Sequence, residues 1–448
     1  MPTPDVARAL SERSVSLFLQ GRPVDALISE QEVVTIYRRL AETHPGRYRE
    51  ELAGSLRSLG TYCSASGHTD EAIRVTQEAV AIYRTLDAPS GLALSLSNLG
   101  HYLASSGRLA EAVTAVREAA AIYRSLAETH PGRYRDDLAG SLHRLGAYLL
   151  ESSLPAEALT ATQEAVAIRR QLADTDSGRD ALAGSLNNLA TTLLELRRPA
   201  EALPAAQEAV AICRELAEKN PGRYLPDLAG FLSNLGAVFA ALGNPTDALP
   251  VTEETLAIYR RLAGTRPDRY LPEVARTLRN LDLTYRAMGR PGHAVPVLRE
   301  AVAIYRELAE THPARYRPFL ANAVFDLAVR LSDAGRHAEA LPAKQEAVAI
   351  YRELAETHPG YRRHLGISLH NLGNGLLEWE RPAEALAAEQ EAVAIFRELA
   401  EVSPDDRPLL ARFLADLSAI YTTLGRTAEA EAAREEGERI ERDDPGDS

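Results

Sequence analysis

The sequence predicts an all-α solenoid of about ten helix–turn–helix repeats, and three observations support this prediction. One phrase, clearest in Gln345–Pro359 (QEAVAIYRELAETHP), recurs along the 448-residue chain. Two landmarks, the Ile of AIYR and a small residue ten positions before it, shift together by 40 to 46 residues from copy to copy. No segment shows the alternation that is typical of a β-strand. Such a period indicates units stacked around one continuous core.

Each repeat contains two helical patterns. In Gln345–Glu356 the apolar residues fall at i, i+3, i+4 and i+7, which places them on one helix face, and Pro359 follows the pattern as a helix stop. In Leu182–Leu196 (LAGSLNNLATTLLEL) a leucine stripe predicts another helix, and a turn such as Gly107-Arg108 leads onward. We call the helix with the leucine stripe the first helix of a hairpin and the AIYR helix the second.

We expect a single solenoid over residues 1–442, with an N-terminal capping repeat at 1–44, central repeats at 45–402 and a C-terminal capping repeat at 403–442. The first repeat carries Arg13 and Ser14 where later repeats carry Leu-Gly, and the last ends as EEGERIERDDPGDS. Polar substitutions at both ends are expected of capping units, which face water. Residues 443–448 are expected to form a disordered tail.

The composition excludes several classes of protein. A formal net charge of -13 disfavours nucleic-acid binding, which needs clustered positive charge. No run is long and apolar enough for a membrane span, and the N-terminus lacks the apolar region of a secretory signal. Cys63 and Cys213 lie far apart in helical patterns and predict buried free thiols. We therefore expect a cytoplasmic protein that binds no nucleic acid and no membrane.

The sequence contains no recognisable catalytic or cofactor motif. Phosphate-binding glycine loops, HExxH, CxxC and GxSxG are all missing from it, so we expect a non-catalytic protein without a cofactor. Histidines precede the repeated Pro at His44, His130, His312 and His358. Because repeat spacing keeps these side chains apart, a role at the helix end is favoured over a metal site.

These features resemble the tetratricopeptide repeat family. One copy of its signature is Leu59-Gly60, Gly67, Ala72 and Ala79. The small residues allow the two helices of a hairpin to approach closely. These repeats are longer than the usual ones of about 34 residues, with the excess in the second helix and the ETHPGRY linker, and this form is similar to kinesin-light-chain-type repeats of bacterial proteins. The resemblance implies a right-handed superhelix whose first helices line a concave groove.

Two repeated aromatic positions allow either a structural or a functional interpretation. The linker motif PxRY, as in Pro45–Tyr48, predicts either an exposed row of Arg and Tyr or a helix stop whose Tyr packs on the hairpin. The Tyr of AIYR, as in Tyr83, predicts either core between repeats or a stacking surface. The structural interpretation is favoured for both, because each copy occurs in the same local context.

An asparagine row in the first helices is the sharpest candidate site. Each of these residues directly precedes the Leu of the Leu-Gly pair or its equivalent, and the row comprises Asn98, Asn188, Asn234, Asn280 and Asn371. The position one residue earlier varies, and its candidate groove residues are Arg57, His143, Asn187, Arg279 and His370. Amides both donate and accept, so the row suits the backbone of an extended peptide. The alternative is that these amides tie adjacent helices together.

From these features we expect a protein- or peptide-binding scaffold that uses the concave groove, in a bacterial signalling or regulatory system. A second hypothesis is self-assembly into an oligomer or filament, because near-identical repeats can stack end to end. A third is a sensor or adaptor arm for a separately encoded effector enzyme.

Overall fold

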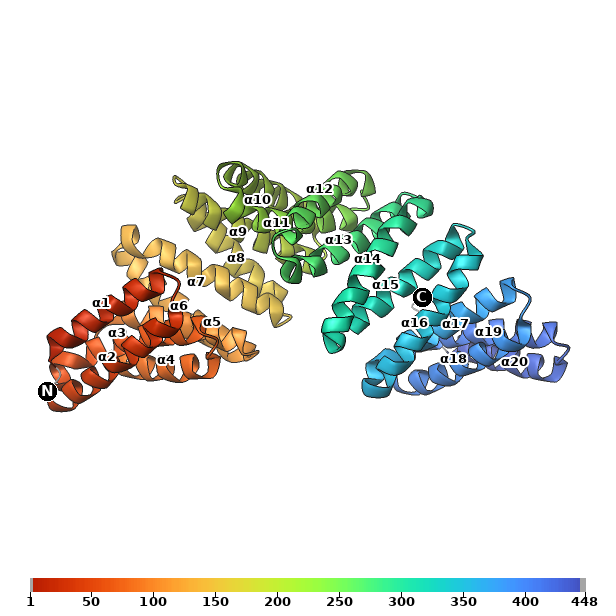
Figure 1. Cartoon of the computed structure of the whole chain (residues 1–448), viewed down its shortest axis with the longest axis horizontal. Helices are drawn as coiled ribbons and strands as arrows, with labels where there is room; N and C mark the ends of the chain where they lie inside the picture. Colours follow the sequence, from red (N-terminus) through yellow and green to blue (C-terminus); the bar gives the residue numbers. More distant parts are fainter. Residues whose placement is uncertain (1–2, 444–448) are drawn as a thin grey trace. The chain divides into compact units, whose positions relative to one another are not determined.

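The computed structural model describes residues 3–443, and within them the chain forms twenty α-helices, two short 3-10 helices and no β-strand (Figure 1). The all-α architecture of helix–turn–helix repeats is confirmed. The chain divides into two compact units, one ending at Leu242 and the other starting at Gly243. Odd-numbered helices are first helices and even-numbered helices are second helices.

Unit 1 contains eleven helices, which are α1 (Pro4–Leu19), α2 (Pro23–Thr43), α3 (Pro45–Ala65), α4 (Thr69–Tyr83), α5 (Pro89–Ser105), α6 (Leu109–Thr129), α7 (Pro131–Glu151), α8 (Pro155–Arg170), α9 (Asp176–Glu195), α10 (Pro199–Lys219) and α11 (Pro221–Ala241). Each helix packs against the next along the chain. The first helices α3 and α5, α7 and α9, and α9 and α11 also contact each other. Unit 1 therefore presents a surface of successive first helices, here called its first-helix face.

Unit 2 contains nine α-helices and two short 3-10 helices, which are α12 (Pro245–Ala263), α13 (Pro267–Ala287), α14 (Pro291–Thr311), α15 (Pro313–Asp333), α16 (His337–Thr357), η1 (Pro359–Tyr361), α17 (Arg362–Glu378), α18 (Pro382–Val402), η2 (Pro404–Asp406), α19 (Arg407–Thr423) and α20 (Thr427–Asp443). Its helices also pack in chain order, and α15 contacts α17 directly. Its first-helix face is formed by α13, α15, α17 and α19.

The Leu-Gly pair lets the two helices of a hairpin approach closely. A Cβ atom on Gly60 would lie 2.3 Å from the Thr76 hydroxyl oxygen, and one on Gly100 would lie 2.3 Å from a methyl carbon of Val116. Both partners belong to the second helix of the same hairpin. Glycine is thus required at these points of contact because any side chain would collide with the facing helix.

The turn between first and second helices uses one backbone conformation in all ten hairpins. Seven of the turns place a glycine at positive φ, between 66° and 82°, as at Gly107. The other three turns place Ser153, Arg197 and Glu380 in the same left-handed region, at φ of 58°, 58° and 52°. This conformation costs a residue with a side chain about 1 kcal/mol relative to glycine.

The expected ETHPGRY linker is mostly helical. The second helix α2 ends at Thr43, His44 is the only residue outside a helix, and Pro45 begins α3. His44 has φ of -137° and ψ of 67°, which stops the helix, while proline suits the first position of the next one because that position needs no amide hydrogen. The PxRY motif is therefore the first turn of a first helix.

The repeated tyrosines are core residues, as predicted. Those of AIYR are all buried, from Tyr37 at 9% exposed to Tyr351 at 1%. The PxRY tyrosines Tyr48, Tyr224, Tyr270 and Tyr316 are also buried, and each lies beneath the guanidinium of the preceding arginine, 5.0 to 5.3 Å from its carbon atom. Cys63 and Cys213 are buried free thiols, and burial raises the pKa of Cys63 to about 11.

The two ends of the described chain differ in polarity. The first hairpin exposes aliphatic side chains at Val15, Leu19, Val24 and Ile28. The last helix, α20, carries alternating acidic and basic residues and ends at Asp443. The rest of the tail predicted to be disordered, 444–448, lies outside the described residues.

Candidate functional site

Polar side chains connect successive first helices at one repeated position. In each case the residue before the asparagine position of one repeat contacts the asparagine position of the next. We call these contacts the first-helix ladder, which comprises Ser97–Arg144, His143–Asn188, Asn187–Asn234, Arg279–Asp326 and His370–Asp416. The asparagine row and the varying position one residue before it, both noted in the sequence, are thus partners across the junctions between repeats.

In unit 1 the ladder consists of neutral and cationic groups. Asn234 donates from Nδ2 to Oδ1 of Asn187 over 2.8 Å, and Arg144 donates from Nη2 to the Ser97 hydroxyl over 2.7 Å. Nδ2 of Asn188 lies 3.3 Å from Nδ1 of His143. In the two contacts that involve asparagine, each amide uses one of its two donors or two acceptor lone pairs. All of the ladder's asparagines are half-buried.

In unit 2 the ladder joins basic side chains to carboxylates. Arg279 donates from Nη2 to Asp326 Oδ2 over 2.6 Å. His370 lies between two carboxylates, with Nδ1 2.9 Å from Glu389 Oε1 and Nε2 3.6 Å from Asp416 Oδ2. His370 is also buried and stacked on Phe413 at 4.1 Å between ring centroids, so the structure withdraws this predicted groove residue from the surface.

The remaining predicted groove residues take no part in the first-helix ladder. Asn98, Asn280 and Asn371 are half-buried, and their side chains form no hydrogen bond to any other described residue. Arg57 is half-buried, with its Nε atom lacking a partner. Burial raises the pKa of the neighbouring Tyr83 hydroxyl, and the Arg57 charge and a hydrogen bond with it oppose that shift.

Two arginines that are not among the predicted groove residues converge in unit 1: Arg144, which belongs to the ladder, and Arg169, which lies beside it. Nη2 of Arg169 and Nη2 of Arg144 lie 3.9 Å and 4.0 Å from the point where Gly140 would carry a Cβ atom. Arg169 stands in α8 where other repeats carry the AIYR tyrosine, and Arg144 in α7 where they carry asparagine. These two departures from the repeat were the available sequence signal.

Burial and positive charge set the protonation of the nearby histidines. The pKa of His143 is lowered to about 4, mainly by burial and then by the charges of Arg169 and Arg144. The pKa of His101 is lowered by burial and by Arg144. Both rings are therefore neutral at pH 7, and no carboxylate beside them favours the charged form.

A second ladder, formed by arginine and glutamate, runs along the second helices. The Arg of AIYR in one repeat pairs with the Glu of QEA in the next, at N–O distances of 2.5 to 2.8 Å. The pairs are Arg38–Glu78, Arg84–Glu118, Arg124–Glu164, Arg170–Glu208, Arg260–Glu300, Arg306–Glu346, Arg352–Glu391 and Arg397–Glu436. These pairs are exposed, so each contributes little stability.

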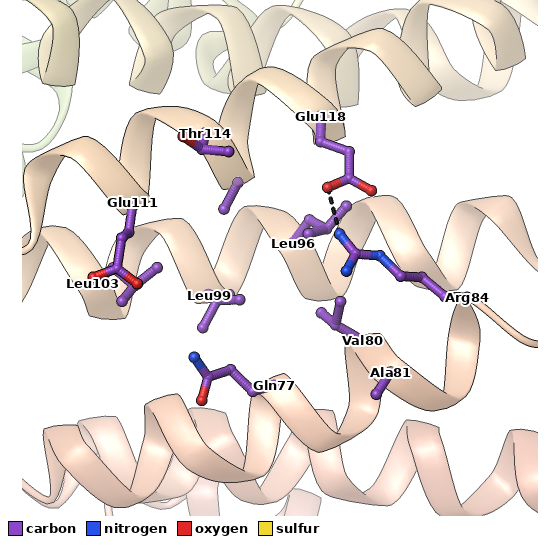
Figure 2. A pocket seen from close by; sticks show the side chains of 11 residues that line it. Gln77, Val80, Ala81, Arg84, Leu96, Leu99, Leu103, Glu111, Thr114 and Glu118 are labelled. Atoms are coloured by element: carbon purple, nitrogen blue, oxygen red, sulfur yellow. Dashed lines mark hydrogen bonds and ion pairs between the residues drawn. The ribbon is translucent and has the colours of Figure 1, made fainter.

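A shallow groove lies between second helices in each unit. Figure 2 shows the groove of unit 1, where Arg84 and Glu118 point toward each other between α4 and α6 and Leu96 and Leu99 line the helix between them. Its volume is about 330 Å³. Gln390, Arg397 and Glu436 line the equivalent groove in unit 2. Because its polar rim is already paired, this groove offers no unpaired charge to a ligand.

The described residues include no cluster of three or more His, Cys, Asp or Glu side chains arranged to hold a metal ion. Over the same residues, no helix is long and apolar enough to cross a membrane.

Comparison with known families identifies the repeat. Two family models described as tetratricopeptide repeat match residues 227–307 and 320–398, and residues 92–132 and 182–221. Together they cover just over half of the chain. A model of anaphase-promoting complex subunit 5 matches residues 43–106. No curated protein sequence matches the chain significantly.

Solved structures share the fold at low sequence identity. A STAND-type signal transduction ATPase with a tetratricopeptide repeat sensor, from Pyrococcus horikoshii, is 13% identical with a TM-score of 0.53, over 82% of this chain and 52% of that one. BtubC (BKLC) from P. vanneervenii is 21% identical with a TM-score of 0.43, over 53% of this chain and 91% of that one.

Proposed function

The chain belongs to the tetratricopeptide repeat family, and on that premise we propose that it binds an extended peptide segment of a partner protein along the first-helix face of unit 1. Tetratricopeptide repeats are generally non-catalytic scaffolds for protein–protein interaction. The observation that carries the proposal is the unit 1 ladder, in which the half-buried amides Asn187, Asn188 and Asn234 each use only part of their hydrogen-bonding capacity on one another or on His143. We place this scaffold in a bacterial signalling or regulatory system, as a sensor or adaptor arm for a separately encoded effector.

A peptide backbone presents one donor and one acceptor per residue, and an amide side chain can pair with both. Asn98 lies in α5 and forms no side-chain hydrogen bond to the described residues, while Asn188 in α9 uses one capacity on His143. These two residues can therefore bind a peptide without breaking the contacts that tie the repeats together.

The test is a selection of binding peptides from a random library on the full chain, followed by affinity measurements on variants. We expect Asn98→Ala with Asn188→Ala to weaken binding of the selected peptides by at least about tenfold, which is the loss of one or two hydrogen bonds in an interface. Gln207→Ala is the matched control, because it removes an exposed amide from the second helix α10. Unchanged affinity in the double variant, with unchanged helicity, would refute the proposal.

Self-association is the second candidate function, and the exposed aliphatic residues of the α1–α2 hairpin favour it. Leu19 is 80% exposed and Val24 and Ile28 are 54% and 53% exposed. Such residues cost free energy in water and favour burial against another surface. Light scattering over a wide concentration range tests this candidate: a larger particle that Leu19→Glu with Ile28→Glu converts to monomer supports it, whereas a monomer throughout eliminates it.

A further inference from the structure

We propose that Arg144 and Arg169 form an oxyanion site on unit 1, which binds the acidic side chain of a partner peptide through its carboxylate or phosphate oxygens. The inference rests on the proposed function and specifies which peptides the first-helix face selects. It begins from the two guanidinium groups that converge over Gly140.

The two cations lack an anionic partner inside the protein. Arg169 is only 9% exposed, and its Nη1 donates to the Ala181 carbonyl oxygen and the Ser185 hydroxyl, both over 2.6 Å. Arg144 donates to the Ser97 hydroxyl. Neither guanidinium forms an ion pair with a carboxylate of the described residues, and the Nε atom of each is buried without a hydrogen-bond partner.

Nearby acidic residues reduce the positive potential without neutralising it. Burial lowers the pKa of Arg169, the charge of Arg144 lowers it further, and Asp136 and Asp180 raise it. Asp180 is already paired with Arg223, 3.2 Å away. Asp136 is exposed one turn before Gly140 on α7. A buried cation held this way is costly unless an anion joins it.

The groups around the two arginines also donate hydrogen bonds. Nδ1 of His143 faces the Ser185 hydroxyl at 3.4 Å and the Asn188 amide nitrogen at 3.3 Å, both of which can donate to it. A neutral ring that accepts at Nδ1 carries its hydrogen on Nε2, and thus becomes a donor. The site is accessible, because Arg144, Gly140 and Gly184 are half-buried.

Two guanidinium groups and a neutral donor are suited to an oxyanion with two or three oxygens. Arginine binds carboxylate and phosphate through two parallel hydrogen bonds, and these charge-assisted bonds are stronger than neutral ones. The absence of a side chain at Gly140 keeps the point between the two Nη2 atoms open. A neutral peptide would leave both charges uncompensated, so the site discriminates by charge.

The test uses three labelled peptides that differ only in carrying Glu, phosphoserine or Gln at alternate positions, with fluorescence anisotropy on the full chain. The variant is Arg144→Asn with Arg169→Tyr, which restores the residues that other repeats carry and therefore preserves the fold. Arg124→Gln is the matched control, because it removes one exposed positive charge from the second-helix ladder.

We expect the Glu or the phosphoserine peptide to bind at least about tenfold more tightly than the Gln peptide, and the double variant to lose that preference while the control keeps it. Whichever of the two acidic peptides binds more tightly identifies carboxylate or phosphate as the source of the oxyanion. Absence of a preference for either acidic peptide, or an equal preference in the double variant, would overturn the inference. If the Gln peptide then still binds, and its binding still depends on Asn98 and Asn188, the proposed function holds and only the oxyanion site is refuted.

Discussion

The first-helix faces of unit 1 and unit 2 are built from the same kind of repeat, but their arginine side chains have different partners. In unit 2 the cations of this face have acidic partners, with Arg279 on Asp326 and Arg330 on Asp333 and Asp282. In unit 1 Arg223 pairs with Asp180, but Arg144 and Arg169 contact only neutral groups among the described residues. These cations of unit 2 are therefore compensated by its own carboxylates, whereas Arg144 and Arg169 of unit 1 keep their charge for a partner.

A second difference concerns space on the same face. Four residues before the asparagine position, unit 1 carries glycine at Gly54, Gly140, Gly184 and Gly230 but leucine at Leu94. Unit 2 carries larger side chains at this position, such as Asn322, which accepts a hydrogen bond of 2.7 Å from the Tyr351 hydroxyl. Repeats with a near-identical core can therefore carry two kinds of first-helix face. In one, carboxylates of the protein pair with the arginines, and in the other, two arginines have no carboxylate partner.

The largest expected effect is a difference in stability between removing an arginine that pairs with a carboxylate and removing one that does not. Arg330→Met should destabilise unit 2 by about 3 kcal/mol, because it removes the ion-pair partner of the buried Asp282. Burial already raises the pKa of Asp282 to about 6, and the Arg330 charge opposes that shift across 3.5 Å. Arg169→Tyr in unit 1 should cost nothing, because no acid loses a partner. Urea denaturation with hydrogen exchange resolved by unit measures both, and equal losses would remove the distinction between the faces.

The next effect concerns two buried glutamates at one repeat position. Glu389 in unit 2 contacts His370, whereas both carboxylate oxygens of Glu30 in unit 1 lack a hydrogen-bond partner. Burial raises the pKa of Glu30 to about 7, against the opposing effects of Ser14 and Arg57. Because this folded-state pKa exceeds the unfolded value of 4.5, the protonated form is favoured by folding, and stability falls as the pH rises from 4.5 through 7.

Glu30→Gln should therefore stabilise unit 1 by about 1–3 kcal/mol at pH 8 and have little effect at pH 4. Glu389→Gln serves as the counterpart in unit 2 and should destabilise it, since it removes the carboxylate that holds His370. Thermal unfolding followed at both pH values measures the difference. A Glu30→Gln variant that keeps the parent's pH dependence would contradict the assignment of that dependence to Glu30.

A smaller effect is expected where neutral amides join repeats. Asn187→Ala and Asn234→Ala should each cost unit 1 about 1 kcal/mol, and the double variant should cost less than the sum because both lose the same hydrogen bond. A double-mutant cycle measures this coupling energy. Strict additivity would show that the amides do not tie the two helices together, and would sharpen the case for a purely ligand-facing role.

The smallest effect should be the same in both units. Arg197→Gly in unit 1 and Glu380→Gly in unit 2 should each stabilise the chain by about 0.5–1 kcal/mol, since each places glycine at a turn with positive φ. These two variants serve as a control for the comparison, because the units share the geometry of this turn but differ in the side chains of their first-helix faces. Opposite signs in denaturation experiments would show that the turns also differ between the units.

The repeat made most of the fold predictable from the sequence. The hairpins, their Gly turns and the buried AIYR tyrosines follow from residues close together in the chain, such as Leu99-Gly100 and Gly107. The linker was the exception: Pro45 looked like a stop for the helix before it, and it is the start of the next one. A proline satisfies both roles, so the sequence alone does not separate them.

The candidate site was only partly predictable. The row of Asn98, Asn188 and Asn234 could be found from its constant position, but its contacts join residues about one repeat apart. Which residue of one helix meets which residue of the next depends on the offset between repeats, and that offset is a packing property. Arg169 was missed because it occupies a core tyrosine position, where a cation was not expected.

The most direct test of the difference between the faces is hydrogen exchange on the full chain with and without the Glu-bearing or phosphoserine-bearing peptide, whichever binds more tightly. We predict slowed exchange in the first helices α5, α7 and α9 of unit 1, with α13, α15 and α17 of unit 2 unchanged. Protection confined to unit 2, or spread equally over both units, would contradict the account.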